Sequence, residues 1–378
     1  MRKTICEVRS ACTACSACVY ACPVGAIRLV EDSCGAEFAM LDESLCVKCG
    51  RCATVCHICT LCEKKTPEAV CAVWACDADK EVSSGGIGSL LYNKFIDSGA
   101  VVVGVDWDGE MNAVHRVTEN AEDIARFRGS KYVKSDLSGA IPEIGAALKN
   151  DRRVLFIGLP CQVSAIKRLY DCEGLYTADL VCHGVPPAGY FKEYIASLGQ
   201  EDVRSARFRG SEDFVLRLFD GDGECAYRCG QHDDPYFKAF LVGLTYRENC
   251  YECRYACSER VGDITLGDFW GLKKSTQEAP REGRASLVLV NTEKGKRLFE
   301  LISNHCIFEE HTLEEAVREN GQLKAPSARH PERARFIKNY SKYGFVKALK
   351  KTKIAKEIKN RNKFFAKVKR KIALIFGR

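Results

Sequence analysis

The stretch "CTACSACVYACP" (residues 12–23) places four cysteines within eleven residues and a proline after the last of them. The same cysteine spacing returns in "CVKCGRCATVC" (residues 46–56), and the two runs are 34 residues apart. Two cysteines are enough to close a loop with a disulfide. Runs of four at short, repeated spacings therefore indicate ligands that surround one object.

This spacing is that of bacterial two-cluster ferredoxins, in which the fourth cysteine of each run binds the cluster of the other run. It predicts two 4Fe–4S clusters. The ligands of the first are Cys12, Cys15, Cys18 and Cys56, and those of the second are Cys46, Cys49, Cys52 and Cys22. Zinc is the alternative, but it prefers pairs of cysteines and leaves the third and fourth cysteine of each run unexplained. His57 stands where the second run would have proline.

Composition is that of a globular protein. Of the 378 residues, 46% are hydrophobic and 28% charged, and a length of roughly 150 residues per domain predicts two or three domains. "MRKTICEVRS" at the start contains no apolar run of the kind that directs secretion. The 23 cysteines are then expected in a reducing cytoplasm, where thiols bind metal or do redox chemistry.

Three regions differ in pattern. Residues 1–62 hold twelve cysteines and should depend on metal for order. Residues 69–325 alternate between short apolar runs, such as "AVVVGVD", "RVLFIGLP" and "LYTADLVC", and helical stretches. This alternation predicts an α/β domain with a mixed sheet and some α+β character, covered by helices on both faces. Residues 326–378 form a basic, helical tail.

A further group of cysteines follows predicted strands. Cys161 and Cys182 come at the ends of two strands, where open α/β sheets place ligand sites, and "NCYECRYAC" begins at residue 249. A third 4Fe–4S cluster is therefore a hypothesis for Cys161, Cys182, Cys250 and Cys253. The alternative is buried cysteines with a small zinc site. Cys59 and Cys62 are interpreted as a loop pair or as alternative ligands.

Two glycine-containing segments suit an anion. "SSGGIGSLL" places Ser84, Gly85 and Gly86 directly before a predicted helix, where free N–H groups favour a phosphate. "RFRGSKYVKSD" combines a turn, a hydroxyl, a cation and an aromatic ring in Gly129, Ser130, Lys131 and Tyr132. A plain helix cap and an ordinary loop are the alternatives. No G-x-G-x-x-G follows a strand, which disfavours a standard nicotinamide site.

In combination the motifs resemble one family. After the ferredoxin run come "SSGGI", "RGSKYV", "GLPCQVSAIKRL", "LVCHGVP", "CYECRYACSERVGDITLGDFWG" and "LVLVNTEKG". This order resembles the coenzyme F420 hydrogenase/dehydrogenase beta-subunit family, in the form with an N-terminal two-cluster ferredoxin domain. The resemblance implies an iron–sulfur flavoprotein with FAD on the "SSGGI" and "GSKY" segments and a third cluster on the strand-end cysteines and the C-x2-C pair. His183 is a candidate proton donor near the flavin, or a packing residue.

The expected function is that of an oxidoreductase that passes electrons between 4Fe–4S clusters and, through FAD, a two-electron carrier or substrate. Ferredoxin, coenzyme F420 or a partner oxidoreductase are the expected partners. The rival hypothesis is a non-catalytic electron-transfer subunit that feeds a partner enzyme.

The last 33 residues, 346–378, contain thirteen Lys or Arg and a single acid, Glu357. Apolar residues recur there at helical spacing, namely Ile354, Ile358, Phe365, Val368, Ile372 and Ile375. Three interpretations stay open: a helix on the inner membrane surface, a grip on an acidic partner, or docking on the chain's own body. No nucleic-acid module is recognisable.

Overall fold

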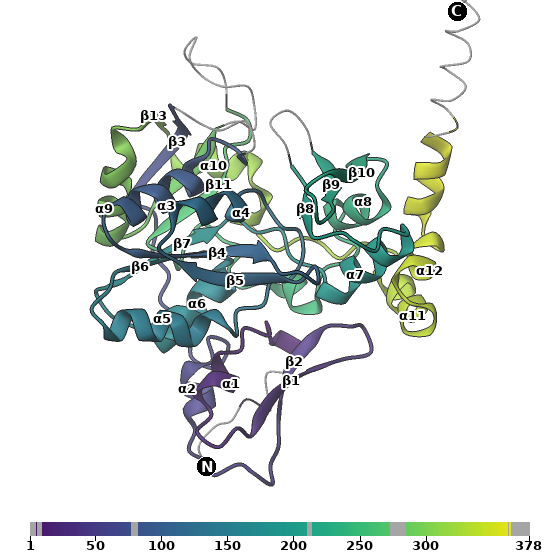
Figure 1. Cartoon of the computed structure of the whole chain (residues 1–378), viewed down its shortest axis with the longest axis horizontal. Coiled ribbons are helices and arrows are strands. Elements are labelled where there is room, and N and C mark those ends of the chain that lie inside the picture. The colour runs from purple at the N-terminus through teal and green to yellow at the C-terminus, as the bar shows by residue number, and fades with distance from the viewer. Residues whose placement is uncertain are drawn as a thin grey trace, which may run out of the picture.

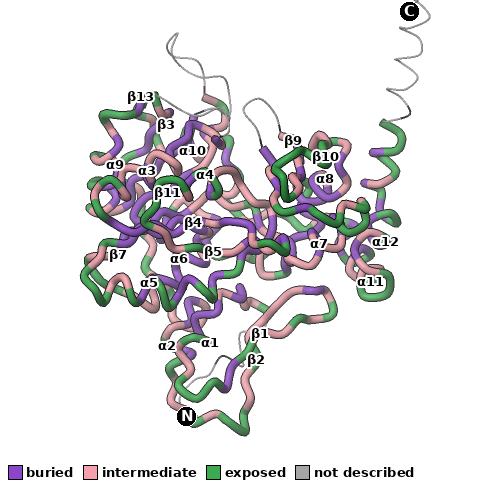
Figure 2. Tube along the Cα trace, in the orientation of Figure 1, coloured by how far each residue is buried: buried purple, intermediate pink, exposed green. Residues whose placement is uncertain are grey.

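The computed structural model describes residues 5, 10–76, 82–209, 214–272, 285–361 and 363. A large sheet with its helices forms the main body, a small sheet lies beside it, and the cysteine-rich segment lies against one helical face (Figure 1). Buried residues are concentrated in the strands and in the helix faces that cover them (Figure 2). This arrangement confirms the predicted α/β class with an N-terminal ferredoxin-like region.

The large sheet has eight strands in the order β13-β3-β12-β11-β7-β6-β4-β5. The four consecutive strands β11, β7, β6 and β4 are parallel, and antiparallel strands flank them on both sides, three on one and one on the other. In chain order the strands are β3 (Ala69–Ala75), β4 (Val101–Trp107), β5 (Ala113–Thr118), β6 (Val154–Gly158), β7 (Leu175–Leu180), β11 (Ile264–Asp268), β12 (Ser286–Val290) and β13 (Cys306–Glu310). The predicted mixed sheet is thus present, with its parallel part at the centre.

Helices cover both faces of this sheet because successive side chains of a strand point to opposite sides. In β4, Val102 packs with α3 (Ile87–Asp97) and α9 (Glu293–Ser303). Its neighbours Val101 and Val103 pack with α5 (Ala140–Lys149) and α6 (Pro160–Leu169). The remaining helices are α4 (Ile124–Phe127), α7 (Ala188–Ser197), α8 (Pro235–Leu241), α10 (Leu313–Glu319), α11 (Arg333–Tyr343) and α12 (Phe345–Lys350), with short 3-10 turns η2 (Ala121–Asp123), η3 (Glu248–Glu252) and η4 (Gly321–Leu323).

A separate antiparallel sheet contains β8 (Ser205–Arg207), β9 (Val215–Phe219) and β10 (Cys225–Gly230). Residues 220–223 ("DGDG") connect β9 to β10 in a hairpin, and Gly223 takes a φ of 83° that favours glycine. Aromatic side chains of this lobe, of α7 and of α11 share one core.

The cysteine-rich segment contains α1 (Ala17–Ala21), the hairpin β1 (Ile27–Glu31) and β2 (Glu37–Leu41), and α2 (Arg51–Val55). Both helices pack on the face of the main body formed by α5 and α6 (Figure 1). Arg168 of α6 donates a hydrogen bond to the Thr54 carbonyl at 2.7 Å, and Tyr190 of α7 donates to the Cys34 carbonyl at 2.7 Å. Contacts with both α6 and α7 therefore hold the segment against the main body.

The basic tail begins as a docked helix. Residues 353–361 are helical, and Ile354 and Ile358 are buried in the same core as Phe345. Lys238 and Glu357 form an ion pair at 2.9 Å. This part of the tail therefore follows the docking interpretation, while Phe365, Val368, Ile372 and Ile375 lie outside the described residues. None of the helices in the described ranges has the length and apolar character that crossing a bilayer requires.

Candidate functional site

The two ferredoxin-like runs have the same backbone conformation. Helices α1 and α2 begin 34 residues apart. Ala14 and Lys48, at equivalent positions, both have a φ of 50°, and Cys22 and Cys56 share a φ of −76° and a ψ of 113°. A positive φ is uncommon for residues with a side chain. Its occurrence at the same place in both runs indicates that each loop is shaped for one purpose.

That conformation directs backbone N–H groups at sulfur. The N–H of Ala14 donates to Cys12 Sγ at 3.4 Å, and the N–H of Lys48 donates to Cys46 Sγ at the same distance of 3.4 Å. A second donor, from Ala39 of β2, reaches Cys12 Sγ at 3.4 Å. Hydrogen bonds of this kind stabilise a thiolate, which is the form that binds iron.

The structure brings the first predicted ligand set together. Cys12, Cys15, Cys18 and Cys56 line one small cavity of about 20 Å³. Burial raises the pKa of Cys15 to about 11. Such thiols lose their protons when a metal supplies the compensating positive charge. The donor set therefore fits a cationic iron core.

The second predicted set corresponds to the first through the 34-residue repeat of the sequence. Cys52 is buried in α2, while Cys22, Cys46 and Cys49 are half-buried. Large apolar side chains are exposed beside them, with Leu45 and Val47 more than half exposed. This set therefore lies nearer to solvent than the first.

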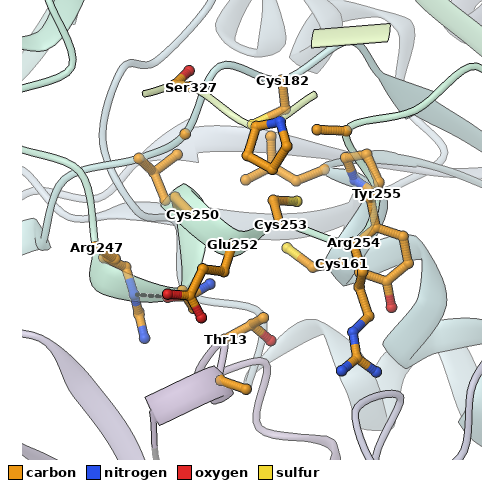
Figure 3. Close-up of a pocket in the computed structure, with 18 of the residues that line it drawn as sticks. Thr13, Cys161, Cys182, Arg247, Cys250, Glu252, Cys253, Arg254, Tyr255 and Ser327 are labelled. Carbon is orange, nitrogen blue, oxygen red and sulfur yellow. Dashed lines mark hydrogen bonds between the residues drawn. The ribbon is translucent and has the colours of Figure 1, made fainter. Parts of the chain in front are cut away.

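The four cysteines of the third hypothetical set also meet. Cys161 lies in the first turn of α6, directly after β6, and Cys182 follows β7, the parallel neighbour of β6. Cys250 lies in η3 and Cys253 ends it. All four line one cavity of about 150 Å³. Figure 3 shows the sulfurs of Cys161 and Cys253 pointing toward each other across it.

A buried ion pair holds the walls of this cavity, which we call the strand-end cavity. Arg260 donates to Asp179 of β7 at 3.0 Å and to the Tyr255 and Cys257 carbonyls, each at 3.0 Å. The other oxygen of Asp179 accepts the N–H of Gly262 at 3.0 Å. Asp179 thus connects the strand that precedes Cys182 with the loop that carries Cys253.

Two buried cations face the strand-end cavity. Lys134 and Arg247 line it and are 6% and 3% exposed. Arg247 donates to the Cys12 and Glu37 carbonyls at 3.1 and 2.6 Å, while its Nη1 is buried without a partner among the described residues. Burying a cation is costly unless an opposite charge lies near. A thiolate-bound cluster carries such a charge, so the surroundings fit it.

No set of three or more His, Cys, Asp or Glu side chains within the described ranges is arranged around a single metal ion. A cubane cluster spreads its ligands around a body of several atoms, so thiols that hold one do not converge on a point.

Residues of the cysteine-rich segment complete the strand-end cavity. Ser10, Thr13 and Ile58 line it together with the four cysteines, and Thr13 and Ile58 also line the cavity of the first set. In Figure 3, Thr13 faces the sulfurs of Cys161 and Cys253 from below. The two cysteine sets are therefore next to each other.

His57 is buried where the ferredoxin pattern has proline. Its Nε2 lies 2.9 Å from Thr13 Oγ1, and its Nδ1 lies 2.6 Å from the Tyr255 hydroxyl. Sequence reasoning noticed the departure but assigned it no role. The feature of the sequence that points to a role for His57 is its position directly after the predicted ligand Cys56.

The residues predicted to contact flavin lie elsewhere. Ser84 and Gly86 have φ of 55° and 79° at the start of α3. Gly85 is packed against β3, and a Cβ on it would overlap the Val73 carbonyl oxygen. The Ser83 hydroxyl is buried without a hydrogen-bond partner among the described residues. That orphaned group and the turned backbone suit a phosphate.

The second segment that is predicted to contact flavin follows α4. Gly129 has a φ of 80°, and Ser130 comes next. Lys131 donates to the Arg126 carbonyl at 3.1 Å, as cations near helix ends do. The Tyr132 ring stacks on Phe240 with 4.4 Å between ring centroids, so one of its faces is used in packing. His183 is exposed at the rim of the strand-end cavity and is distant in sequence from these two segments. Its carbonyl accepts a hydrogen bond from the Ser327 hydroxyl at 2.8 Å.

Four of the cysteines outside the three sets illustrate other roles. Cys62 Sγ donates to the Ser164 carbonyl at 3.4 Å, and Cys59 packs in a cluster that contains cysteines of both ferredoxin-like sets. Cys71 is buried in the core under α3, whereas Cys76 is exposed. The pair Cys71 and Cys76 is thus not brought together, as the alternation in a strand predicts.

Comparison with known proteins finds matches in two parts of the chain. Residues 11–59 match the model of the 4Fe-4S dicluster domain, which indicates an iron–sulfur region in the N-terminal part. Residues 151–316 match the model that describes the C terminus of the beta subunit of coenzyme F420 hydrogenase/dehydrogenase. The two matches, to a dicluster domain and to the C terminus of this beta subunit, confirm the resemblance seen in the motifs.

Two curated proteins are similar to the chain over part of its length. It is 26% identical over 174 residues to an F(420)H(2) dehydrogenase subunit from Methanosarcina mazei, a match that covers 41% of this chain and 47% of that protein. It is 30% identical over 166 residues to the coenzyme F420-dependent sulfite reductase of Methanocaldococcus jannaschii, covering 42% of this chain and 25% of that protein. The chain thus spans about half and a quarter of these relatives.

Among solved structures, a chain of the F420-reducing [NiFe] hydrogenase complex from Methanosarcina barkeri is similar at 17% identity and a TM-score of 0.42, covering 76% of this chain and 91% of that one.

Proposed function

We propose that the chain is an iron–sulfur flavoprotein oxidoreductase that passes electrons between three 4Fe–4S clusters and, through FAD, a two-electron carrier. One observation carries the proposal: Thr13 and Ile58 line both the cavity of the first cysteine set and the strand-end cavity. Two thiol sets whose cavities share lining residues suit the passage of single electrons from one site to the next.

In this proposal the twelve cysteines have the ligand roles that the sequence predicts. The two ferredoxin-like sets and the strand-end set would each hold one cluster. When bound, clusters exchange single electrons and FAD links one-electron to two-electron chemistry. The half-buried second set, with exposed Leu45 and Val47 beside it, is the side at which an external electron carrier would approach.

The chain's own residues set the electrostatics of the strand-end cavity. Lys134 and Arg247 supply two buried positive charges, which offset the charge of four thiolates and favour the reduced state of what they hold. The Asp179–Arg260 pair holds the cysteine-bearing loop in place. Preorganisation of this kind keeps the site from rearranging when its charge changes.

FAD is the flavin of this proposal. Its support is the family resemblance, the orphaned Ser83 hydroxyl and the positive φ of Ser84 and Gly86 at the start of α3. Ser84, Gly86 and Lys131 would contact the phosphates. Gly85 serves close packing of that segment, and Gly129 and Ser130 form the second turn. His183, at the rim of the strand-end cavity, would hold a proton for the two-electron carrier.

The names of the relatives suggest the carrier. Both mention F420, so coenzyme F420 is the proposed two-electron partner. The second candidate function is a relay subunit without its own substrate, which the word "subunit" in the name of one relative favours. Reduction of the flavin in the isolated chain by a soluble two-electron donor would distinguish an enzyme from a relay.

Counting iron, sulfide and flavin after purification without oxygen tests the proposal directly. Three clusters and one flavin predict about twelve irons and about one FAD per chain. A preparation with about eight irons would exclude the third cluster and leave the first two. A preparation without flavin would favour the relay.

A further inference from the structure

His57 is one of the most completely buried polar residues in the described chain, at 1% exposure. Its two ring nitrogens both have partners, Thr13 Oγ1 at 2.9 Å and the Tyr255 hydroxyl at 2.6 Å. Proline, which the ferredoxin pattern has here, offers no polar atom on its ring. The side chain therefore makes contacts that the usual residue cannot.

These contacts lead to different cysteine sets. His57 directly follows Cys56 of the first set in the chain. Its hydrogen-bond partner Thr13 lies between Cys12 and Cys15. Its other partner, Tyr255, lines the strand-end cavity and lies two residues after Cys253.

The hydrogen bonds are compatible with a neutral ring. A neutral imidazole has one donor and one acceptor nitrogen. Both hydroxyl partners can donate or accept, so a single tautomer satisfies both bonds without placing a charge between two anionic sites.

We propose that His57 is a positioning residue that bridges the first cluster site and the strand-end site through the hydrogen bond from its Nδ1 to the Tyr255 hydroxyl. This inference rests on the proposed third cluster. The bridge fixes the spacing of the two sites and provides a short route of bonded atoms from Cys56 to Cys253. One electron crosses in each step, no bond forms or breaks, and no proton has to move.

Two variants test the bridge with little change in volume. Tyr255→Phe removes only the hydroxyl, and His57→Leu removes both hydrogen bonds while keeping the site apolar. We expect electron transfer from the ferredoxin-like side to the strand-end site to slow roughly 10–100-fold, the range for loss of a hydrogen-bonding partner next to a metal ligand. Rapid-freeze EPR after mixing with a one-electron reductant measures this rate. The redox midpoint of the strand-end site should shift in both variants. His57→Gln, which keeps a donor and an acceptor, should restore much of the rate.

Tyr251→Phe is the matched control, because its hydroxyl in the same loop donates to the Gly243 carbonyl at 2.7 Å and does not reach His57. It should leave the rate unchanged. The double variant His57→Leu/Tyr255→Phe should be no slower than the slower single variant if both residues act through one bond.

The outcomes separate the bridge from the proposed function. Variants that keep about twelve irons and transfer electrons at the wild-type rate overturn the bridge and leave the clusters standing. Wild-type protein with only about eight irons overturns the third cluster and the bridge together. If His57→Leu loses iron, the conservative Tyr255→Phe variant decides alone, and an unchanged rate and midpoint in it overturn the bridge.

Discussion

Arg260 and Asp179 form an ion pair with Nη2 3.0 Å from Oδ1, and their side chains are 1% and 0% exposed. Asp179 lies in β7, the strand that leads to Cys182. Arg260 donates to the carbonyls of Tyr255 and Cys257. The pair therefore joins two of the segments that carry the strand-end cysteines. Because it is buried, its removal has a larger effect than that of a surface pair.

Arg260→Met should lower the free energy of unfolding by about 3–5 kcal/mol, because it leaves the Asp179 carboxylate buried without its partner. Iron at the strand-end site should be lost in the same variant. Urea unfolding and iron counting measure the two effects. Arg297→Met, at an exposed pair with Glu173, is the control and should change neither. An Arg260→Met protein that unfolds at the wild-type urea concentration would contradict this role.

Cys161→Ser should remove the iron of one cluster, about four atoms, and slow electron transfer to the flavin. The ferredoxin-like sets should keep their iron because they share no ligand with Cys161. Cys71→Ala, at a buried cysteine in the core, is the control and should leave the iron content unchanged. Full iron content together with normal flavin reduction in Cys161→Ser would reduce Cys161 to a packing residue.

Stability should fall on acidification partly through His115. Burial lowers the pKa of this histidine to about 4, whereas in the unfolded chain it is about 6.5. Its Nδ1 faces the Asp136 carbonyl at 3.0 Å, and the nearby Lys134 also disfavours a charge on the ring. Between these two pKa values only the unfolded chain binds the extra proton. The contribution of neutral His115 to the stability of the fold is therefore complete above the higher pKa and declines as the pH falls toward the lower one.

His115→Phe tests this directly, since the ring already stacks on Phe156. The dependence of the urea midpoint on pH, between about 7 and 5, should be shallower in the variant than in the wild type. Parallel curves would show that His115 does not contribute.

The docked part of the tail should contribute to stability. Ile354 is 2% exposed, and Ile354→Ala should lower the free energy of unfolding by about 2–5 kcal/mol, as buried aliphatic truncations do. Lys356→Ala on the exposed side is the control. Equal unfolding curves for Ile354→Ala and wild type would mean that the helix is not docked in solution.

The membrane and partner interpretations concern the residues after Arg361. Deleting 346–378 would remove part of a core that includes Leu349, Ile354 and Ile358, so a chain ending at Arg361 is the better comparison. If the basic end binds an anionic surface, full-length protein should sediment with anionic vesicles at low salt and the shortened chain should not. Absence of binding by the full-length chain would exclude the membrane.

Much of the cysteine chemistry could be predicted because ferredoxin-like ligands lie close together in the chain. Spacing alone indicated the repeat, and the shared φ of Ala14 and Lys48 shows the same repeat in the backbone. Strands β4, β6 and β7 were equally accessible, since buried parallel strands are continuous apolar runs. β5 and α5, by contrast, were not recognised from the sequence.

Contacts between distant segments could not be predicted. Nothing local in the sequence brings Lys134, Arg247 and Thr13 to one cavity, because tertiary packing alone decides this. Local patterns also misled in part. Gly85 and Tyr132 were read as flavin contacts, and the structure gives each a packing reason, against β3 and on Phe240 respectively. Whether they also meet a flavin stays a prediction.

The strand-end cavity has a consequence for the order in which the protein is built. Its cysteines come from α6, from the end of β7 and from η3, and Cys161 and Cys253 are far apart in the chain. Such a set comes together only after the parallel strands have paired. The ferredoxin-like runs can collect iron while the chain is still being synthesised, whereas the strand-end site has to be filled in a protein that is already folded. Maturation of this protein is therefore expected to occur in two stages, and a folded species lacking only the last cluster should accumulate when iron is scarce.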